Sequence, residues 1–205
     1  MLLTSWGAGQ RRVSFEAWGP NGTREMMEYL QKAFDFDIRV RVTNQNKEGI
    51  RVVSHDINEG IVFDNNGVKV TAFVVDHGPV KPAFGYRVDY GGHSVVLSGD
   101  TRFSENLIEF SRGADVLIHE VADEEALKRL TPEGRERTIA LHTTAEQAGE
   151  VFARVKPRLA VYSHAGESQN IIARTRTTYS GPLESGDDLM TIEISDKIDV
   201  RHFKR

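Results

Sequence analysis

Four apolar segments of this chain each end in side chains that bind metal ions or transfer protons. Short apolar runs are typical of buried strands, and α/β folds present their ligands at the carboxyl ends of strands. A site of this kind needs several strand ends at one edge of a sheet. The four segments, each with the polar residues that follow it, are 68–75 with Asp76 and His77, 94–98 with Asp100, 115–118 with His119 and Glu120, and 159–163 with His164. The repeated pattern predicts a metal site at that edge.

His77, Asp100 and His164 are the strongest candidates for metal ligands. Two imidazoles and one carboxylate suit zinc, iron or manganese and leave positions open for water. A metal ion lowers the pKa of its bound water to roughly 7 and so supplies hydroxide at neutral pH. Asp100 has two oxygens and can bridge two ions. Spacing alone also permits another interpretation, in which one histidine is buried and hydrogen-bonded and the other two residues cap helices.

His119, Glu120 and His142 lie at or just beyond expected element ends, where their side chains can reach the same edge. A histidine beside a carboxylate is a good general acid, because its neighbour tunes its pKa. The alternatives are that His142 is a loop residue next to a helix cap and that Glu120 is an acid favoured by a helix dipole.

Composition limits the class of protein. The 205 residues fit one domain, and the formal charge of −4 gives no general attraction to nucleic acid or to an anionic membrane. The chain has no cysteine, so any metal ion must be held by His, Asp, Glu or water. No apolar run approaches the roughly 20 residues of a membrane-spanning helix, and the first residues lack the features of a signal peptide. We therefore predict a cytoplasmic protein with no membrane partner.

The remaining pattern alternates strands with helices, which predicts the α/β class. A helix is expected from Thr23, an amphipathic strand over 38–43 and a polar loop over 131–138. Hairpin turns are expected at 65–67 and 91–92. Thr144 and Gln147 form a capping box that opens a helix ending before Pro157. A closing hairpin is expected over 189–203.

The order of these segments resembles the metallo-β-lactamase superfamily, in particular the branch shared by ribonuclease Z and arylsulfatase-like hydrolases. The similarity covers essentially residues 1–205, as one domain. The matching segments are Asp76-His77-Gly78-Pro79, Phe84-Gly85-Tyr86-Arg87, Ser98-Gly99-Asp100-Thr101, Ile118-His119-Glu120, His142-Thr143-Thr144-Ala145 and Tyr162-Ser163-His164, with the turns 18–23 and 179–183.

The resemblance implies an αβ/βα sandwich with a two-metal site, usually zinc, with manganese or iron as alternatives. By this resemblance Asp100 bridges the two metals, His77 binds one and His164 binds the other. His142, supported by Glu120, would protonate the leaving group.

One family motif is absent. The His-x-His-x-Asp-His segment, which supplies most ligands in the superfamily, belongs before the start of this chain, and no histidine precedes His55. We expect an N-terminally incomplete sequence, because the other ligands are retained together. The alternative is a domain that has lost its catalytic half. In either case the chain as given is expected to be weakly active or inactive.

For the substrate, we expect a small sulfate or phosphate ester, because the long Gly/Pro-rich arm of ribonuclease Z has no counterpart here. The alternatives are a 3′-tRNA-processing endoribonuclease, with RNA as partner, and a non-catalytic binding module of the same fold. A one-metal iron site is disfavoured because the close His-x-Asp pair of such oxygenases is missing. An uncovered sheet face predicts self-association.

Overall fold

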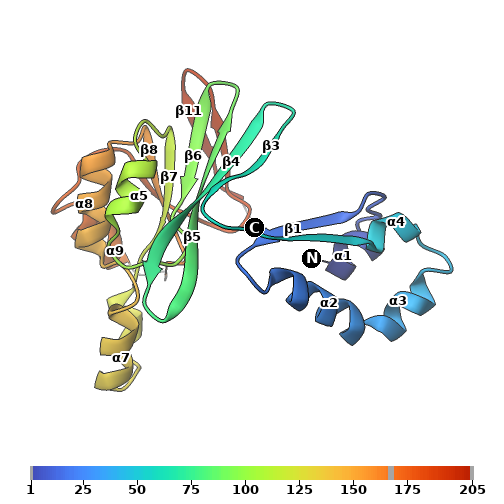
Figure 1. The fold of residues 1–205 in the computed structure, drawn as a ribbon. Coiled ribbons are helices and arrows are strands. Elements are labelled where there is room, and N and C mark those ends of the chain that lie inside the picture. Colours follow the sequence, from blue (N-terminus) through green and yellow to red (C-terminus); the bar gives the residue numbers. More distant parts are fainter. Residues whose placement is uncertain (1, 166–168, 204–205) are drawn as a thin grey trace. The chain divides into compact units, whose positions relative to one another are not determined.

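The computed structural model describes residues 2–165 and 169–203 and contains two compact units. The first unit ends at Asn58 and the second begins at Glu59, and Figure 1 shows the elements of each. The mixed α/β class is confirmed, whereas the single domain over residues 1–205 stays a prediction. No helix within the described ranges is long and apolar enough to cross a bilayer.

The first unit has a two-stranded parallel sheet accompanied by short helices. Between residues 2 and 58 the buried apolar side chains are few, namely Trp6, Met27, Ile50 and Ile57. Trp6 is anchored by its Nε1–H, which donates to the carbonyl of Asn46 at 2.7 Å. In chain order the elements are α1 (Leu2–Gly7), β1 (Phe15–Gly19), α2 (Thr23–Ala33), α3 (Asp35–Arg41), α4 (Lys47–Ile50) and β2 (Val52–Asp56).

The strand expected over 38–43 is wrong, because helix α3 occupies most of this segment. Its apolar residues alternate, but its charges follow the helical period of four. Arg39 pairs with Asp35 at 2.9 Å and Arg41 with Asp37 at 2.8 Å. The acids also lie in the first turn and the arginines in the last, as the helix dipole favours.

The second unit is built on a seven-stranded mixed sheet in the order β3-β4-β5-β6-β7-β8-β9. Strands β3 to β6 pair antiparallel and β6 to β9 pair parallel. Asn66 and Gly67 have φ values of 51° and 79°, and Gly91 and Gly92 have 58° and 84°, so both hairpin turns are confirmed. The strands are β3 (Gly60–Asn65), β4 (Val68–His77), β5 (Val80–Tyr90), β6 (His93–Leu97), β7 (Val116–Glu120), β8 (Leu159–Ser163) and β9 (Leu183–Ser185).

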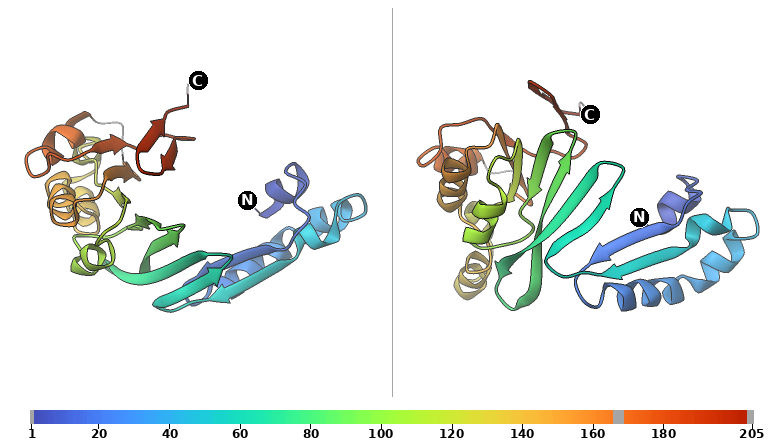
Figure 2. Two further views of the ribbon diagram at one scale, coloured as in Figure 1. Left: turned by 90° about the horizontal axis from the view of Figure 1, so that it is seen from above. Right: turned by 45° about the horizontal axis from the view of Figure 1, so that its top comes forward.

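Helices α5 (Glu105–Phe110), α8 (Ala145–Val155) and α9 (Gln169–Thr175) cover one face of this sheet, and Figure 2 shows them together on one side. The capping box of α8 is present as predicted. On the opposite face, the hairpin of β10 (Thr191–Ile194) and β11 (Ile198–Arg201) packs on Val116, Leu159 and Val161. The closing hairpin is therefore confirmed.

The polar loop expected over 131–138 is also wrong. Residues Pro132–Ile139 form helix α7, preceded by the short helix α6 (Glu124–Leu127). The side chain of Thr131 accepts the N–H of Gly134, and Pro132 takes the first turn, where its missing N–H costs nothing. No residue of α7 is buried, and Figure 1 shows this helix extending away from the sheet.

Candidate active site

The four strands named by the sequence pattern end at the same edge of the sheet. Strands β6, β7 and β8 run parallel, and β4 runs in the same direction because two antiparallel pairings separate it from β6. His77 ends β4, Glu120 ends β7, and Asp100 and His164 follow β6 and β8. Every candidate residue therefore lies in the second unit.

Three histidines and Asp100 gather at this edge. The Nε2 of His164 lies 4.0 Å from Oδ2 of Asp100. The ring of His142 lies between the other two imidazoles, with centroids 5.2 Å from His77 and 5.8 Å from His164. Within residues 2–165 and 169–203, no group of three or more His, Asp or Glu side chains is arranged to hold a metal ion.

The donor atoms nevertheless match a zinc-type ion in kind. Two tetrahedral ligands at about 2.0–2.2 Å from one zinc ion lie about 3.4 Å apart, and the 4.0 Å between Asp100 and His164 is somewhat longer. The Nδ1 of His77 lies 3.0 Å from the carbonyl oxygen of Leu141 and donates to it, which leaves Nε2 as a lone-pair donor. This backbone contact is typical of metal-binding histidines. The donor atoms are of the right type for such an ion, but fewer than three of them are grouped closely enough among the described residues.

Glu120 is held from three directions. It is 1 % exposed, and its Oε1 accepts the N–H of Thr143 at 2.8 Å and that of Thr101 at 3.4 Å. Its Oε2 lies 3.1 Å from Nδ1 of His142. Burial raises the pKa of Glu120 to about 7, and the negative charge of Asp100 acts in the same direction, while the two N–H groups oppose the shift. The carboxyl group is thus poised to change charge near neutral pH.

His142 is the histidine that this carboxylate supports. Burial lowers its pKa most, the charges of His77 and His164 lower it further, and Asp100 opposes them. When Glu120 is ionised it can only accept, so Nδ1–H of His142 donates to it and Nε2 remains free for another partner. A histidine oriented by a carboxylate is the arrangement expected of a general acid or base.

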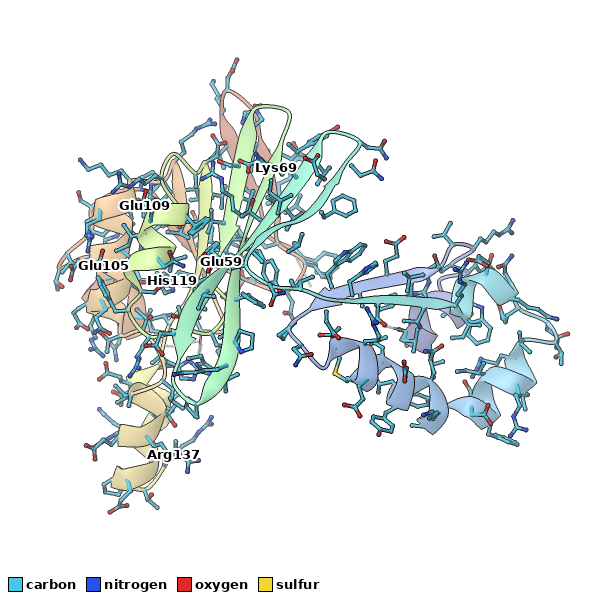
Figure 3. All side chains as sticks on the ribbon, viewed as in Figure 1. Glu59, Lys69, Glu105, Glu109, His119 and Arg137 are labelled. Atoms are coloured by element: carbon cyan, nitrogen blue, oxygen red, sulfur yellow. The ribbon has the colours of Figure 1, made fainter. Side chains whose placement is uncertain are left out.

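His119 has a different environment, although it is next to Glu120 in sequence. Figure 3 shows it among the strands and helices of the second unit, and it is fully buried. Its Nδ1 donates to the carbonyl of Glu120 at 2.7 Å, and its ring meets Phe152 edge-on with centroids 5.9 Å apart. Burial lowers the pKa of His119 to about 4. The histidine with a carboxylate partner is therefore His142 and not His119.

Sequence reasoning gave no role to three buried hydroxyl groups that surround Glu120. Ser98 Oγ accepts the N–H of Glu120 at 3.0 Å, and the hydroxyl of Thr143 donates to the carbonyl of Thr101 at 2.7 Å. All three residues are at most 1 % exposed. A signal was present, since each lies within two residues of Asp100 or His142.

A mixed sheet that brings histidines, an aspartate and a His–Glu pair to one edge is the arrangement of the metallo-β-lactamase-fold hydrolases. Residues 6–165 match the family model described as "Beta-lactamase superfamily domain", and the chain belongs to that superfamily. The resemblance inferred from the sequence motifs is confirmed.

The curated relatives are named ribonuclease Z. The chain is 31% identical over 211 residues to "Ribonuclease Z" of Mycobacterium sp. (strain KMS), covering 98% of this chain and 74% of the relative. It is 30% identical over 207 residues to "Ribonuclease Z" of Mycobacterium tuberculosis (strain ATCC 25618 / H37Rv), covering 95% and 75%. These names favour the ribonuclease Z alternative over the sulfate ester expected from the sequence.

Solved structures share the fold. Human tRNase Z, short form, aligns with a TM-score of 0.59 at 18% identity, covering 89% of this chain and 68% of that one. Zinc-bound PqqB from Methylobacterium extorquens aligns with a TM-score of 0.61 at 16% identity, covering 90% and 65%. At such identities the likeness concerns the fold alone.

Proposed function

We propose that this chain belongs to a metal-dependent ribonuclease Z-type hydrolase that cleaves a phosphodiester bond of RNA. The observation that carries the reaction class is the His142–Glu120 pair, 3.1 Å apart, at the same edge as Asp100 and His164. The choice of RNA over a small ester rests on the ribonuclease Z relatives that span nearly the whole chain.

The residues would divide the work as follows. Asp100, His164 and His77 would hold the metal, with zinc as the first candidate and manganese or iron as alternatives. The bound ion would supply hydroxide at neutral pH. As a hydroxide oxygen forms a new bond to phosphorus and one ester P–O bond breaks, Nε2–H of His142 would give its proton to the leaving oxygen, while Glu120 would hold Nδ1 of the same ring and stabilise its charged form.

The shortage of grouped ligands has a consequence for the chain as given. A catalytic zinc takes about three protein ligands, and the described residues contain no such group. We therefore expect the 205-residue chain to bind zinc weakly and to turn over slowly. Single-turnover conditions with excess protein are needed to see cleavage.

The test uses RNA with a 3′ extension and metal-stripped protein that has been reloaded with zinc, manganese or iron. His142→Ala is expected to lower the cleavage rate by roughly 10²–10⁴-fold with unchanged metal content, because it removes a proton donor and not a ligand. The exposed His202 is the control, and His202→Ala should leave the rate unchanged.

Three outcomes contradict the proposal. Cleavage that persists in His142→Ala means that this residue is not the proton donor. Hydrolysis of an aryl sulfate without cleavage of RNA returns the function to the small-ester alternative. Absence of any cleavage with excess protein and each of the three metals contradicts the activity proposed for these 205 residues.

A further inference from the structure

Two buried threonines from different segments form a hydrogen-bonded link beside Glu120. Thr101 follows β6, Thr143 precedes α8, and both are 0 % exposed. The hydroxyl of Thr143 donates to the carbonyl oxygen of Thr101 at 2.7 Å. We call this pair, with that hydrogen bond, the threonine link.

The threonine link fixes the two groups that hold one oxygen of Glu120. The backbone N–H groups of Thr143 and Thr101 both donate to Oε1, at 2.8 and 3.4 Å. With Oε1 fixed in this way, the other oxygen, Oε2, faces Nδ1 of His142. A carboxylate with one free oxygen can rotate about its last bond, because that torsion is broad. The two N–H donors to Oε1 restrict this rotation.

The same link extends to the segment that carries His77. The Oγ1 of Thr101 lies 3.2 Å from the backbone nitrogen of Asp76 and accepts its N–H. Arg102 reinforces this contact, since its N–H donates to the carbonyl of Asp76 at 2.9 Å and its guanidinium pairs with the carboxylate at 2.7 Å. Thr101 therefore joins the segments of His77, Asp100 and Glu120 at one point.

We propose that the threonine link is a positioning element, in which the hydroxyl of Thr143 keeps Glu120 aligned on Nδ1 of His142. This inference rests on the proposed role of His142 in RNA cleavage. Neither threonine is a catalytic residue, since both act through the carboxylate. A purely structural role would affect the stability of the fold and leave the His142–Glu120 contact unchanged.

The test compares two substitutions at one site. Thr143→Val has nearly the same shape and lacks the donor, so the carbonyl of Thr101 loses its hydroxyl partner. Thr143→Ser keeps the donor. The matched control is Thr175→Val in α9, because Thr175 is also 0 % exposed and also donates a hydroxyl to a carbonyl, that of Ile171 at 2.8 Å.

The first measurement needs neither metal nor substrate. Long-range ¹H–¹⁵N spectra of the metal-free protein, at one alkaline pH, report which ring nitrogen of His142 carries the proton. We expect the Nδ1–H form in the wild type, in Thr143→Ser and in Thr175→Val, and a mixture of both tautomers in Thr143→Val. If Thr143→Val fails to fold, Thr143→Ala takes its place in the same comparison.

The second measurement is RNA cleavage. Under the same single-turnover conditions, we expect Thr143→Val to lower the maximal cleavage rate by roughly 10–100-fold and to leave the half-saturating protein concentration unchanged, because a misplaced catalytic group costs about this much. Thr143→Ser should stay within about threefold of the wild type, because its hydroxyl is retained. If Thr143→Val and Thr175→Val give the same spectrum, the inference is overturned. If the wild type cleaves no RNA, the proposed function fails while the spectra still decide the role of the link.

Discussion

The two units of this protein bury similar sequence patterns to very different extents. Helix α8 of the second unit places Ala148, Val151 and Phe152 on one stripe, and all three are 0 % exposed. Helix α2 of the first unit has an equally regular stripe, yet Met26 is 53 % exposed and Leu30 is 37 % exposed. An amphipathic pattern thus specifies which face of a helix is apolar, but not whether a partner covers it.

The second unit therefore contains most of the buried core, and it also carries all the candidate site residues. Its core is continuous from the sheet through α5, α8 and α9, whereas residues 2–58, the described part of the first unit, bury four apolar side chains. Both tryptophans, Trp6 and Trp18, lie in the first unit. Tryptophan fluorescence therefore reports on the first unit alone, whereas four of the five tyrosines, all except Tyr29, lie in the second.

The largest expected effect comes from removing a central aromatic residue of the second unit. The ring of Phe152 lies 5.5 Å from those of Tyr162 and Tyr179, centroid to centroid. Phe152→Ala should lower the free energy of unfolding by about 3–5 kcal/mol in urea, because it leaves a cavity. Phe36→Ala is the same change at a residue of the first unit that is 76 % exposed, and it should stay within about 0.5 kcal/mol. Equal effects would remove the contrast between the units.

The next effect is a pH dependence confined to the second unit. Glu120 has a pKa of about 7 in the folded chain against 4.5 when exposed. The folded state therefore holds this proton more tightly, and its contribution to stability is lost as pH rises from 4.5 to 7. Glu120→Gln lacks this loss, so its free energy of unfolding should gain about 3 kcal/mol on the wild type over that range.

The neighbouring His119 also titrates, but its contribution is the same in the wild type and in Glu120→Gln. His119 has a folded pKa of about 4, so its contribution to stability falls as pH drops from 6.5 to 4, in the opposite direction to that of Glu120. It is present in both proteins and cancels in their difference. The free energy of unfolding of both proteins is measured by tyrosine absorbance during urea unfolding. If the difference between them does not change with pH, Glu120 titrates as an exposed group.

A smaller loss of stability is expected from changing the first turn of a helix, and it should differ between α8 and α2. Helix α8 has a capping box in which Thr144 Oγ1 accepts the N–H of Gln147, and Thr144→Ala should cost about 1 kcal/mol. Helix α2 begins after Gly22 without a side-chain cap, and the hydroxyl of Thr23, its first residue, donates to the carbonyl of Pro20 at 2.7 Å and accepts no helix N–H. Thr23→Ala should therefore change the unfolding midpoint much less. A larger loss for Thr23→Ala in urea melts would contradict this ranking.

The smallest effect concerns helix α3, which the alternating pattern had predicted as a strand. Asp35→Asn removes the exposed pair with Arg39, and such a pair contributes roughly 0.2–0.5 kcal/mol. Tryptophan-detected urea unfolding at low and high salt is the measurement. The difference between Asp35→Asn and the wild type should vanish at high salt, because salt screens the pair.

The edge of the sheet could be predicted from sequence because its signals are local. Apolar runs, the turn at Asn66 and Gly67, and the polar residue after each run lie within a few positions of one another, so a short window contains them. The strand prediction over 38–43 was wrong because it also relied on a short window of sequence. Its ion pairs begin at Asp35 and Asp37, outside the alternating run that was considered.

The arrangement around Glu120 could not be predicted, because it depends on residues far apart in the chain. The hydroxyl of Thr143 and the carbonyl of Thr101 are 42 positions apart, and no periodicity connects them. The resemblance had already paired Glu120 with His142, but the complete burial of His119, next to Glu120 in sequence, could not be read from the chain. The structure shows that the ring of His119 is buried in the second unit and packs against Phe152.

The chain leaves the site after Glu120, makes α6 and α7, and returns at His142. The N–H of Ala122 donates to the carbonyl of Thr143 at 2.9 Å and closes the base of this excursion, while no residue of α7 is buried. A segment that is fixed at its base and exposed beyond it tolerates insertion and deletion. Related chains can therefore exchange this excursion for a longer or shorter one and inherit the His–Glu pair unchanged. In evolutionary terms, it is a replaceable module beside a fixed His142–Glu120 contact.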